Sequence, residues 1–339
     1  MCIRDSLWTA VQAAGNTAKN YGEFIYTEGK PSGTWQQYYC ASRSVEEGGD
    51  PAQLTTPELA GNYGSVIPSL NAITHPLSPP FDMSIPDLYR YSIWKQDFRA
   101  QGPKDFQMIW LSDDHTGGPV SARSNVASGD LAVGRIVDTI SHSRYWKDSA
   151  IFVVEDDSQN GADHVDGHRA PVQVISPWAT HGTTVSRYYT QINMVRTIEQ
   201  ILGAEPLNQK VAAATPMYDA FAKKPDYTPY TARRNRISLT ENIATPPACG
   251  LDTPANGGPS AKAPATPAAY VSYAAAWEKW AGKQHLSGKR ARADFANPEL
   301  MNRYTWYDAH HWDLPYPGDP RIYLPGEVPG AALPGADTD

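Results

Sequence analysis

Acidic residues and histidines gather in one short segment of this chain, directly after an apolar run. The run, Ile151–Val154, is followed at once by Glu155, Asp156 and Asp157. Further donors come shortly afterwards: Asp163, His164, Asp166 and His168. Carboxylate oxygens and imidazole nitrogens are ligands for divalent cations. Because neighbouring carboxylates repel one another unless a positive group neutralises them, we expect a metal site here.

Each of these residues also has a simpler interpretation. Acidic residues after a strand often only cap the following turn, and a single Asp–His pair is common. For His164 and His168 the alternative is a hydrogen bond that stabilises the loop. Glu155 is expected to orient its neighbours rather than to bind the ion. The number of ionisable groups after one strand favours the metal site.

A second acidic segment follows another apolar run. Residues 106–111 are predicted to form a strand, which ends in the sequence SDDHTGG at residues 112–118. An amphipathic helix is expected at 128–141, with Ser128 as its N-cap, because Leu131 and its apolar successors share one face. The strand at 149–155 comes next.

The order strand, helix, strand indicates a right-handed crossover and parallel neighbours. Parallel strands end at the same edge of a sheet. We therefore expect Asp114 and His115 to share a pocket with Asp156 and Asp157.

The remaining elements complete an α/β fold with a mainly parallel sheet sandwiched by helices. Five more elements are predicted: a helix and a strand within 7–27, a helix at 86–100, a strand at 171–176 and a helix from Thr190 to Gly203. Residues 28–86 show little periodicity and are expected to be a long irregular excursion.

The chain is expected to divide into four parts. Residues 1–6 match the translation of a sequencing adapter and are left out of the fold. The expected core spans 7–221, incomplete at its N-terminus. A Pro-rich arm or linker follows at 222–267. A helical C-terminal extension covers 268–339 and ends in a disordered tail.

Composition excludes several classes of protein. The net charge of −7 argues against a nucleic-acid partner. No apolar run approaches the length of a membrane span, so no integral membrane segment is expected. Apart from Cys2, the cysteines are Cys40 and Cys249, which form either a disulfide or two unrelated thiols.

Other catalytic patterns fit less well. Paired carboxylates could serve glycoside hydrolysis, but that reaction does not explain adjacent acids among several histidines. The G-x-S-x-G pattern of serine hydrolases, the P-loop and the dinucleotide-binding glycine pattern do not occur.

Several segments resemble bacterial phosphoesterases of the alkaline-phosphatase superfamily, a group that includes phospholipase C-like and acid phosphatase-like members. The most specific is IFVVEDDSQNGADHVDGHRAPVQVISPWA, and WLSDDHTGG is similar to the group's Asn-Asp-His-Thr segment, with Asp113 in the asparagine place. LWTAVQAAGNTAKNYGEF, SHSRYWKDSAIFVVEDD and AAATPMYDAF support the resemblance, which covers roughly residues 7–235.

The resemblance implies a metal-dependent hydrolase of phosphate esters. Asp156 and Asp157 match a pair that binds the divalent ion, and further ligands or supporting groups are implied at Asp163, His164 and His168. His115 matches a histidine beside the bound phosphate, with Asp114 as its catalytic neighbour and Thr116 as a further substrate contact. The ion would be Mg, Mn, Ca or Zn, since carboxylates suit the first three and histidines admit zinc.

One departure from the family pattern bears on activity. The family's first metal-binding motif and its Ser/Thr nucleophile precede the segment matched at Leu7, and neither occurs in this sequence. We therefore expect the chain to be the distal, N-terminally truncated part of a catalytic domain, with negligible phosphatase activity alone.

The resemblance also implies a class of substrate, a cellular location and a neighbouring domain. The substrate would be a phosphate-ester small molecule or a phospholipid headgroup, in the periplasm or outside the cell. An upstream β-propeller domain is expected in the intact protein. Two alternatives remain open: a secreted module that binds a cation or anion without turnover, and a glycan-active hydrolase.

Overall fold

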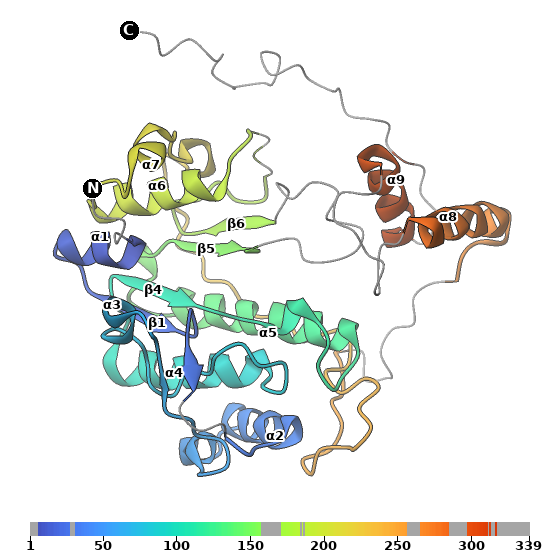
Figure 1. Ribbon diagram of the computed structural model, residues 1–339, viewed down its shortest axis with the longest axis horizontal. Helices are drawn as coiled ribbons and strands as arrows, with labels where there is room; N and C mark the ends of the chain where they lie inside the picture. The colour runs from blue at the N-terminus through green and yellow to red at the C-terminus, as the bar shows by residue number, and fades with distance from the viewer. Residues whose placement is uncertain are drawn as a thin grey trace, which may run out of the picture. The chain divides into compact units, whose positions relative to one another are not determined.

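The computed structural model describes residues 6–27, 31–156, 171–183, 185, 187–255, 265–284, 297–310, 312 and 316 (Figure 1). The chain divides into two compact units. The first comprises Met1–Ala150, Ile175–Ala179 and Gln191–Ala261, and the second comprises Ile151–Val174, Thr180–Thr190 and Lys262–Asp339. Helices and strands alternate along the chain, which makes the fold mixed α/β.

The first unit contains most of the helices. In chain order its elements are α1 (Leu7–Ala13), β1 (Ala18–Tyr21), β2 (Tyr26–Thr27), α2 (Trp35–Glu46), β3 (Tyr63–Gly64), α3 (Pro68–Asn71), α4 (Asp87–Gln101), β4 (Phe106–Ile109), α5 (Ala122–Ser141), α6 (Gln191–Leu202) and α7 (Gln209–Ala213). Short 3₁₀ turns lie between them: η1 (Pro51–Thr55), η2 (Asp113–His115), η3 (Trp146–Asp148) and η5 (Tyr218–Ala220).

The first unit contains a small parallel sheet of two strands. β1 pairs with β4 in parallel, with Ala18 opposite Phe106 and Tyr21 opposite Ile109. The two strands therefore end at the same edge, where the SDDHTGG segment begins. β2 and β3 form a separate antiparallel pair.

Helix α4 lies in the middle of the first unit, between α2 and the β1–β4 pair (Figure 1). Leu88, Tyr91 and Trp94 belong to a core cluster that also contains residues of β1 and α5. Tyr89 and Ile93 belong to a second cluster, together with residues of α2 and η1. Apolar side chains on two faces explain why this helix, predicted at 86–100, is almost wholly buried.

Helix α2 was missed by the sequence pattern, which predicted irregular structure over 28–86. Its buried side chains are largely aromatic, with Trp35, Tyr38 and Tyr39 against the core. Thr34 and Gln37 form a capping box at its N-terminus. The tyrosine-rich composition suggested a surface excursion, whereas the tyrosine rings fill the core.

Helix α5 begins earlier than predicted. Its N-cap is Ser121, whose Oγ accepts a hydrogen bond from the Ser124 N–H at 3.1 Å. The expected cap, Ser128, is buried inside the helix. The first turns bury polar side chains, including Ser124 and Asn125, so the apolar stripe is visible only further along.

The segment expected to be an arm over the surface packs into the first unit through its described residues, 222–255. Leu239 is buried in the core cluster with α4 and α5. The Ala232 N–H donates to Asp138 Oδ2 at 2.7 Å. Cys40 of α2 and Cys249 form a disulfide, with their Cα atoms 5.5 Å apart. This segment, here called the strap, therefore connects α2 to α5.

The second unit contains β5 (Ile151–Val154), most of β6 (Val172–Ile175), α8 (Val271–Lys283) and α9 (Pro298–Ala309). β5 pairs with β6, and the Glu155 N–H donates to the carbonyl of Pro171 at 3.3 Å. The end of β5 thus lies beside the start of β6. β5 is half-buried, whereas the sequence predicted burial on both faces.

Helices α8 and α9 confirm the prediction of helices near 268–283 and 298–307. Aromatic rings connect them: the ring centroids of Tyr273 and Tyr307 lie 5.2 Å apart. None of the helices that the structure describes combines the length and the apolar composition needed to cross a bilayer.

Candidate active-site segments

The first candidate segment follows β4, at the edge where the two parallel strands end. Backbone pairing with β1 continues through Trp110, and the chain then turns through η2. In this turn the Thr116 N–H donates to the carbonyl of Asp113 at 3.0 Å. Asp114 and His115 are exposed, while Asp113 is fully buried.

A pair of buried carboxyl groups holds this turn against the start of α4. Asp87 Oδ1 accepts the Ser112 N–H at 2.9 Å, and its Oδ2 accepts the Asp113 N–H at 3.0 Å. In return, Asp113 Oδ2 accepts the Asp87 N–H at 2.9 Å. Each carboxyl group thus satisfies backbone donors of the other segment, which fixes η2 relative to α4.

The two carboxyl groups are too close and too buried to ionise independently. Burial raises the pKa of Asp87 to about 8, and the Asp113 carboxylate adds to the increase. Burial also raises the pKa of Asp113. Arg90 acts in the opposite direction on both: its Nε lies 3.2 Å from Asp87 Oδ1, although its N–H does not point along a hydrogen bond. Asp87 and Asp113 are therefore structural anchors.

His115 is positioned by an aromatic neighbour. Its ring meets the edge of Phe81 with centroids 4.9 Å apart, and Phe81 in turn stacks on Trp110 at 5.9 Å. His115 Nδ1 lies 3.3 Å from the Thr116 carbonyl oxygen. The imidazole is thus supported on one side and exposed on the other, as a group that contacts substrate must be.

Thr116 has a strained backbone. Its φ of 60° and ψ of 166° fall in a region that glycine adopts easily and β-branched residues avoid. The next residue, Gly117, has φ of 106° and tolerates this without cost. Strain of this kind costs about 1–3 kcal/mol and is concentrated at functional sites. Its position beside His115 supports a functional role for the turn.

The second candidate segment follows β5. Asp156 is exposed and Glu155 is partly buried. The other predicted ligands lie outside the described residues: Asp157, Asp163, His164 and His168. The two candidate segments belong to different units, and their predicted convergence stays a prediction of the sequence.

The donors that the structure does describe are suited to a divalent ion in kind. Asp114, His115 and Asp156 offer carboxylate and imidazole groups on exposed positions. Within the described ranges, no three His, Cys, Asp or Glu side chains gather closely enough to hold an ion. The chemistry of the donors fits a metal.

The sequence missed one residue that shapes the first segment, Asp87. It lies in the first turn of α4, where an acidic residue commonly interacts with the helix N-terminus. That local signal is present in the sequence. However, Asp113, the residue with which Asp87 pairs, lies 26 positions away. The pairing depends on the packing of α4 against β4, which no local pattern reports.

Comparison with known proteins gives one family match. No curated protein matches the chain. Residues 109–205 match the Phosphoesterase family. The matched region begins at the last residue of β4 and contains both acidic segments, and the mixed α/β fold is compatible with such an enzyme. Over these residues the chain is similar to phosphoesterases, which indicates hydrolysis of phosphate esters.

Proposed function

We propose that this chain provides part of the active site of a metal-dependent hydrolase of phosphate esters. The observation that carries the proposal is the family match, because it contains both acidic segments that the sequence singled out. The strained, aromatic-supported turn at His115 is consistent with it.

The roles follow from the chemistry of each group. Asp156 and Asp157 would hold the ion, with Asp163, His164 and His168 as further ligands or supporting groups. The ion would stabilise negative charge on a phosphoryl oxygen and lower the pKa of a nucleophile. Mg, Mn and Ca suit the carboxylates, and zinc becomes suitable if histidines also bind.

The turn after β4 would contact the substrate. The His115 imidazole would donate a hydrogen bond to a phosphate oxygen, supported by the Thr116 hydroxyl. The neighbouring Asp114 would be its catalytic partner. Because no segment of this sequence matches the family's hydroxyl nucleophile, we expect the chain alone to bind phosphate but to turn over esters at a negligible rate.

The Cys40–Cys249 disulfide supports a location in the periplasm or outside the cell. Structural disulfides persist in oxidising compartments and are rare in the cytosol. We therefore include export in the proposal.

Metal-dependent phosphate binding tests the function. Inorganic phosphate is titrated calorimetrically into the full chain, once metal-free and once with added Mn²⁺. We expect Mn²⁺ to strengthen binding and His115→Ala to weaken it about tenfold, since a charge-assisted hydrogen bond contributes about 1.5–3 kcal/mol. Asp148→Asn, which changes an exposed carboxylate in η3, is the matched surface control. The proposal would be refuted if phosphate bound with the same affinity with and without Mn²⁺, and with the same affinity to the wild type and to His115→Ala.

A further inference from the structure

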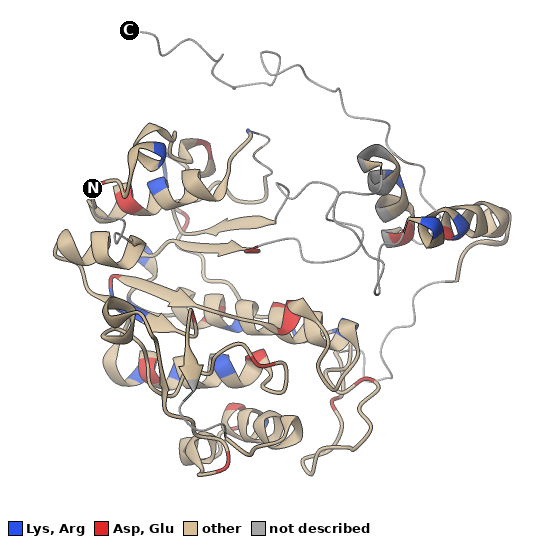
Figure 2. Cartoon of the chain, in the orientation of Figure 1, with Lys and Arg blue, Asp and Glu red and all other residues tan. Residues whose placement is uncertain are grey.

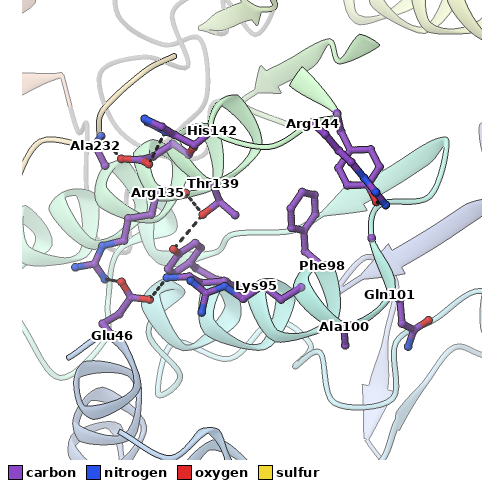
Figure 3. Close-up of a pocket in the computed structure, with 15 residues that line it drawn as sticks. Glu46, Lys95, Phe98, Ala100, Gln101, Arg135, Thr139, His142, Arg144 and Ala232 are labelled. Carbon is purple, nitrogen blue, oxygen red and sulfur yellow. Dashed lines mark hydrogen bonds and ion pairs between the residues drawn. The ribbon is translucent and has the colours of Figure 1, made fainter. Parts of the chain in front are cut away.

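A hollow of about 780 Å³ lies in the first unit, at the ends of α4 and α5 (Figure 3). The residues of the turn at His115 do not line it. α4 begins at Asp87, which accepts hydrogen bonds from that turn, and residues between Tyr91 and Gln101 of the same helix line the hollow. The hollow therefore extends from about 6 Å to about 21 Å along the helix from Asp87.

The lining of the hollow carries an excess of positive charge. It contains four permanently charged bases and two carboxylates: Lys95, Arg99, Arg135, Arg144, Glu46 and Asp138. Figure 2 shows the Lys and Arg positions of α4 and α5 in blue. The C-terminal ends of α2, α4 and α5 reach the lining, and each adds about half a negative charge. About half a positive charge therefore remains, in a protein whose net charge is −7.

The two carboxylates are already engaged. Glu46 lies 2.8 Å from Lys95 Nζ and 3.7 Å from an Arg135 nitrogen, so one negative charge serves two bases. Asp138 pairs with His142 at 3.1 Å and also accepts the Ala232 N–H. Neither carboxylate makes an ion pair with Arg99 or Arg144, and no other described residue does so.

Aromatic rings lie beside three of the four bases: Lys95, Arg135 and Arg144. Arg144 lies over the Tyr145 ring at 4.9 Å, and its Nη2 donates to Tyr145 Oη at 2.8 Å. Lys95 lies 5.1 Å from the centroid of the Tyr91 ring. Figure 3 shows Lys95 and Arg135 on one side of Phe98 and Arg144 on the other. Positioning before binding reduces the entropy that a ligand must offset.

We propose that this hollow binds a small molecule carrying at least two negative charges on oxygen. Its volume falls within the range of about 300–1,000 Å³ typical of small-molecule sites. Arg99 and Arg144 would make the contacts that decide affinity, because they can pair with the ligand without breaking an existing ion pair. This site requires no metal and is separate from the proposed phosphate-ester site.

Pyrophosphate and citrate are the probes, because they place similar charge on phosphate and on carboxylate oxygens. Each is titrated into the metal-free full chain in a chloride buffer of fixed ionic strength. We expect at least one to bind saturably at one site, and the better probe identifies the oxyanion class. The Arg99→Gln/Arg144→Gln variant should bind about tenfold or more weakly, since each lost charged hydrogen bond is expected to weaken binding.

The control variant is Lys147→Gln/Arg236→Gln, which removes two exposed positive charges that do not line the hollow. It should bind as the wild type does. Equal unfolding midpoints for all variants confirm that only binding has changed. The proposal is overturned if neither probe binds, if the two double variants lose affinity equally, or if His115→Ala rather than the arginine variant abolishes binding.

Discussion

Asp113 is the first acid of the segment after β4, and its surroundings give its carboxyl group a structural role. Its carboxyl group is buried against Asp87, and both groups bond to backbone N–H donors. Two buried carboxylates at this distance repel each other, so the pair is most stable when it retains a proton. The anchor of the His115 turn is thus sensitive to pH in this chain.

Asp113→Asn is predicted to reduce this sensitivity, because it removes the carboxylate that adds to the effect of burial on Asp87. The asparagine keeps the oxygen that accepts the Asp87 N–H, and its amide replaces Oδ1, which has no hydrogen-bond partner among the described residues. Because the folded-state pKa of Asp87 is raised from 3.8 to about 8, the contribution of this carboxyl group to stability is most favourable below about pH 4 and is lost as the pH rises towards 8. We expect the variant to be more stable than the wild type by about 1–2 kcal/mol at pH 8 and by much less at pH 5.

Urea unfolding at the two pH values measures this difference. Asp148→Asn, which changes an exposed carboxylate, should leave the pH dependence as it is in the wild type. An Asp113→Asn variant that loses stability with rising pH as steeply as the wild type would show that the carboxyl pair is not the cause.

Among the helices and strands, the sequence predicted those whose apolar residues recur at regular spacing along a short segment. The spacing of Leu131 and Ile136 identified α5, and both side chains are buried. α6 ends at Leu202 before Gly203, which has φ of 65°, as expected of a helix that ends in glycine. The position of Asp114 and His115 directly after a strand was also predicted.

What the sequence missed depends on contacts between distant segments. The strap at 222–255 has few regular elements, so its proline content suggested a linker, yet it contributes Leu239 to the core. The Asp87–Asp113 pair and the basic hollow arise where α4 meets β4 and α5. The pairing of Cys40 with Cys249 likewise required the fold, because two cysteines form no spacing pattern.

The disulfide is predicted to be the main covalent support of the strap. It joins α2 to a segment 209 positions away, so it constrains the unfolded chain strongly. Cys40→Ala/Cys249→Ala should lower the free energy of unfolding by about 2–5 kcal/mol. A reducing agent should lower the unfolding midpoint of the wild type, and the double variant serves as the control because it has no bond to reduce. Equal midpoints for the wild type with and without reductant would contradict this role.

At the scale of the whole molecule, the phosphoesterase match draws on both units. Residues 109–150 belong to the first unit and 151–174 to the second, and each part contains one acidic segment. The net charge of the chain is −7, yet the hollow is locally basic. The electrostatic potential would therefore attract anionic ligands only at local basic sites such as this one. We therefore propose metal binding at the segment after β5 and anion binding at two places in the first unit.

Titration of the full, metal-free chain with Mn²⁺ decides whether it holds a divalent ion. We expect saturable binding that Asp156→Asn weakens by about tenfold or more, since loss of a ligand or of its support typically costs 10–100-fold in affinity. Asp148→Asn should bind Mn²⁺ as tightly as the wild type. Equal affinity in the wild type and in Asp156→Asn, or no Mn²⁺ binding by the wild type, would contradict the assignment of a metal-dependent phosphoesterase.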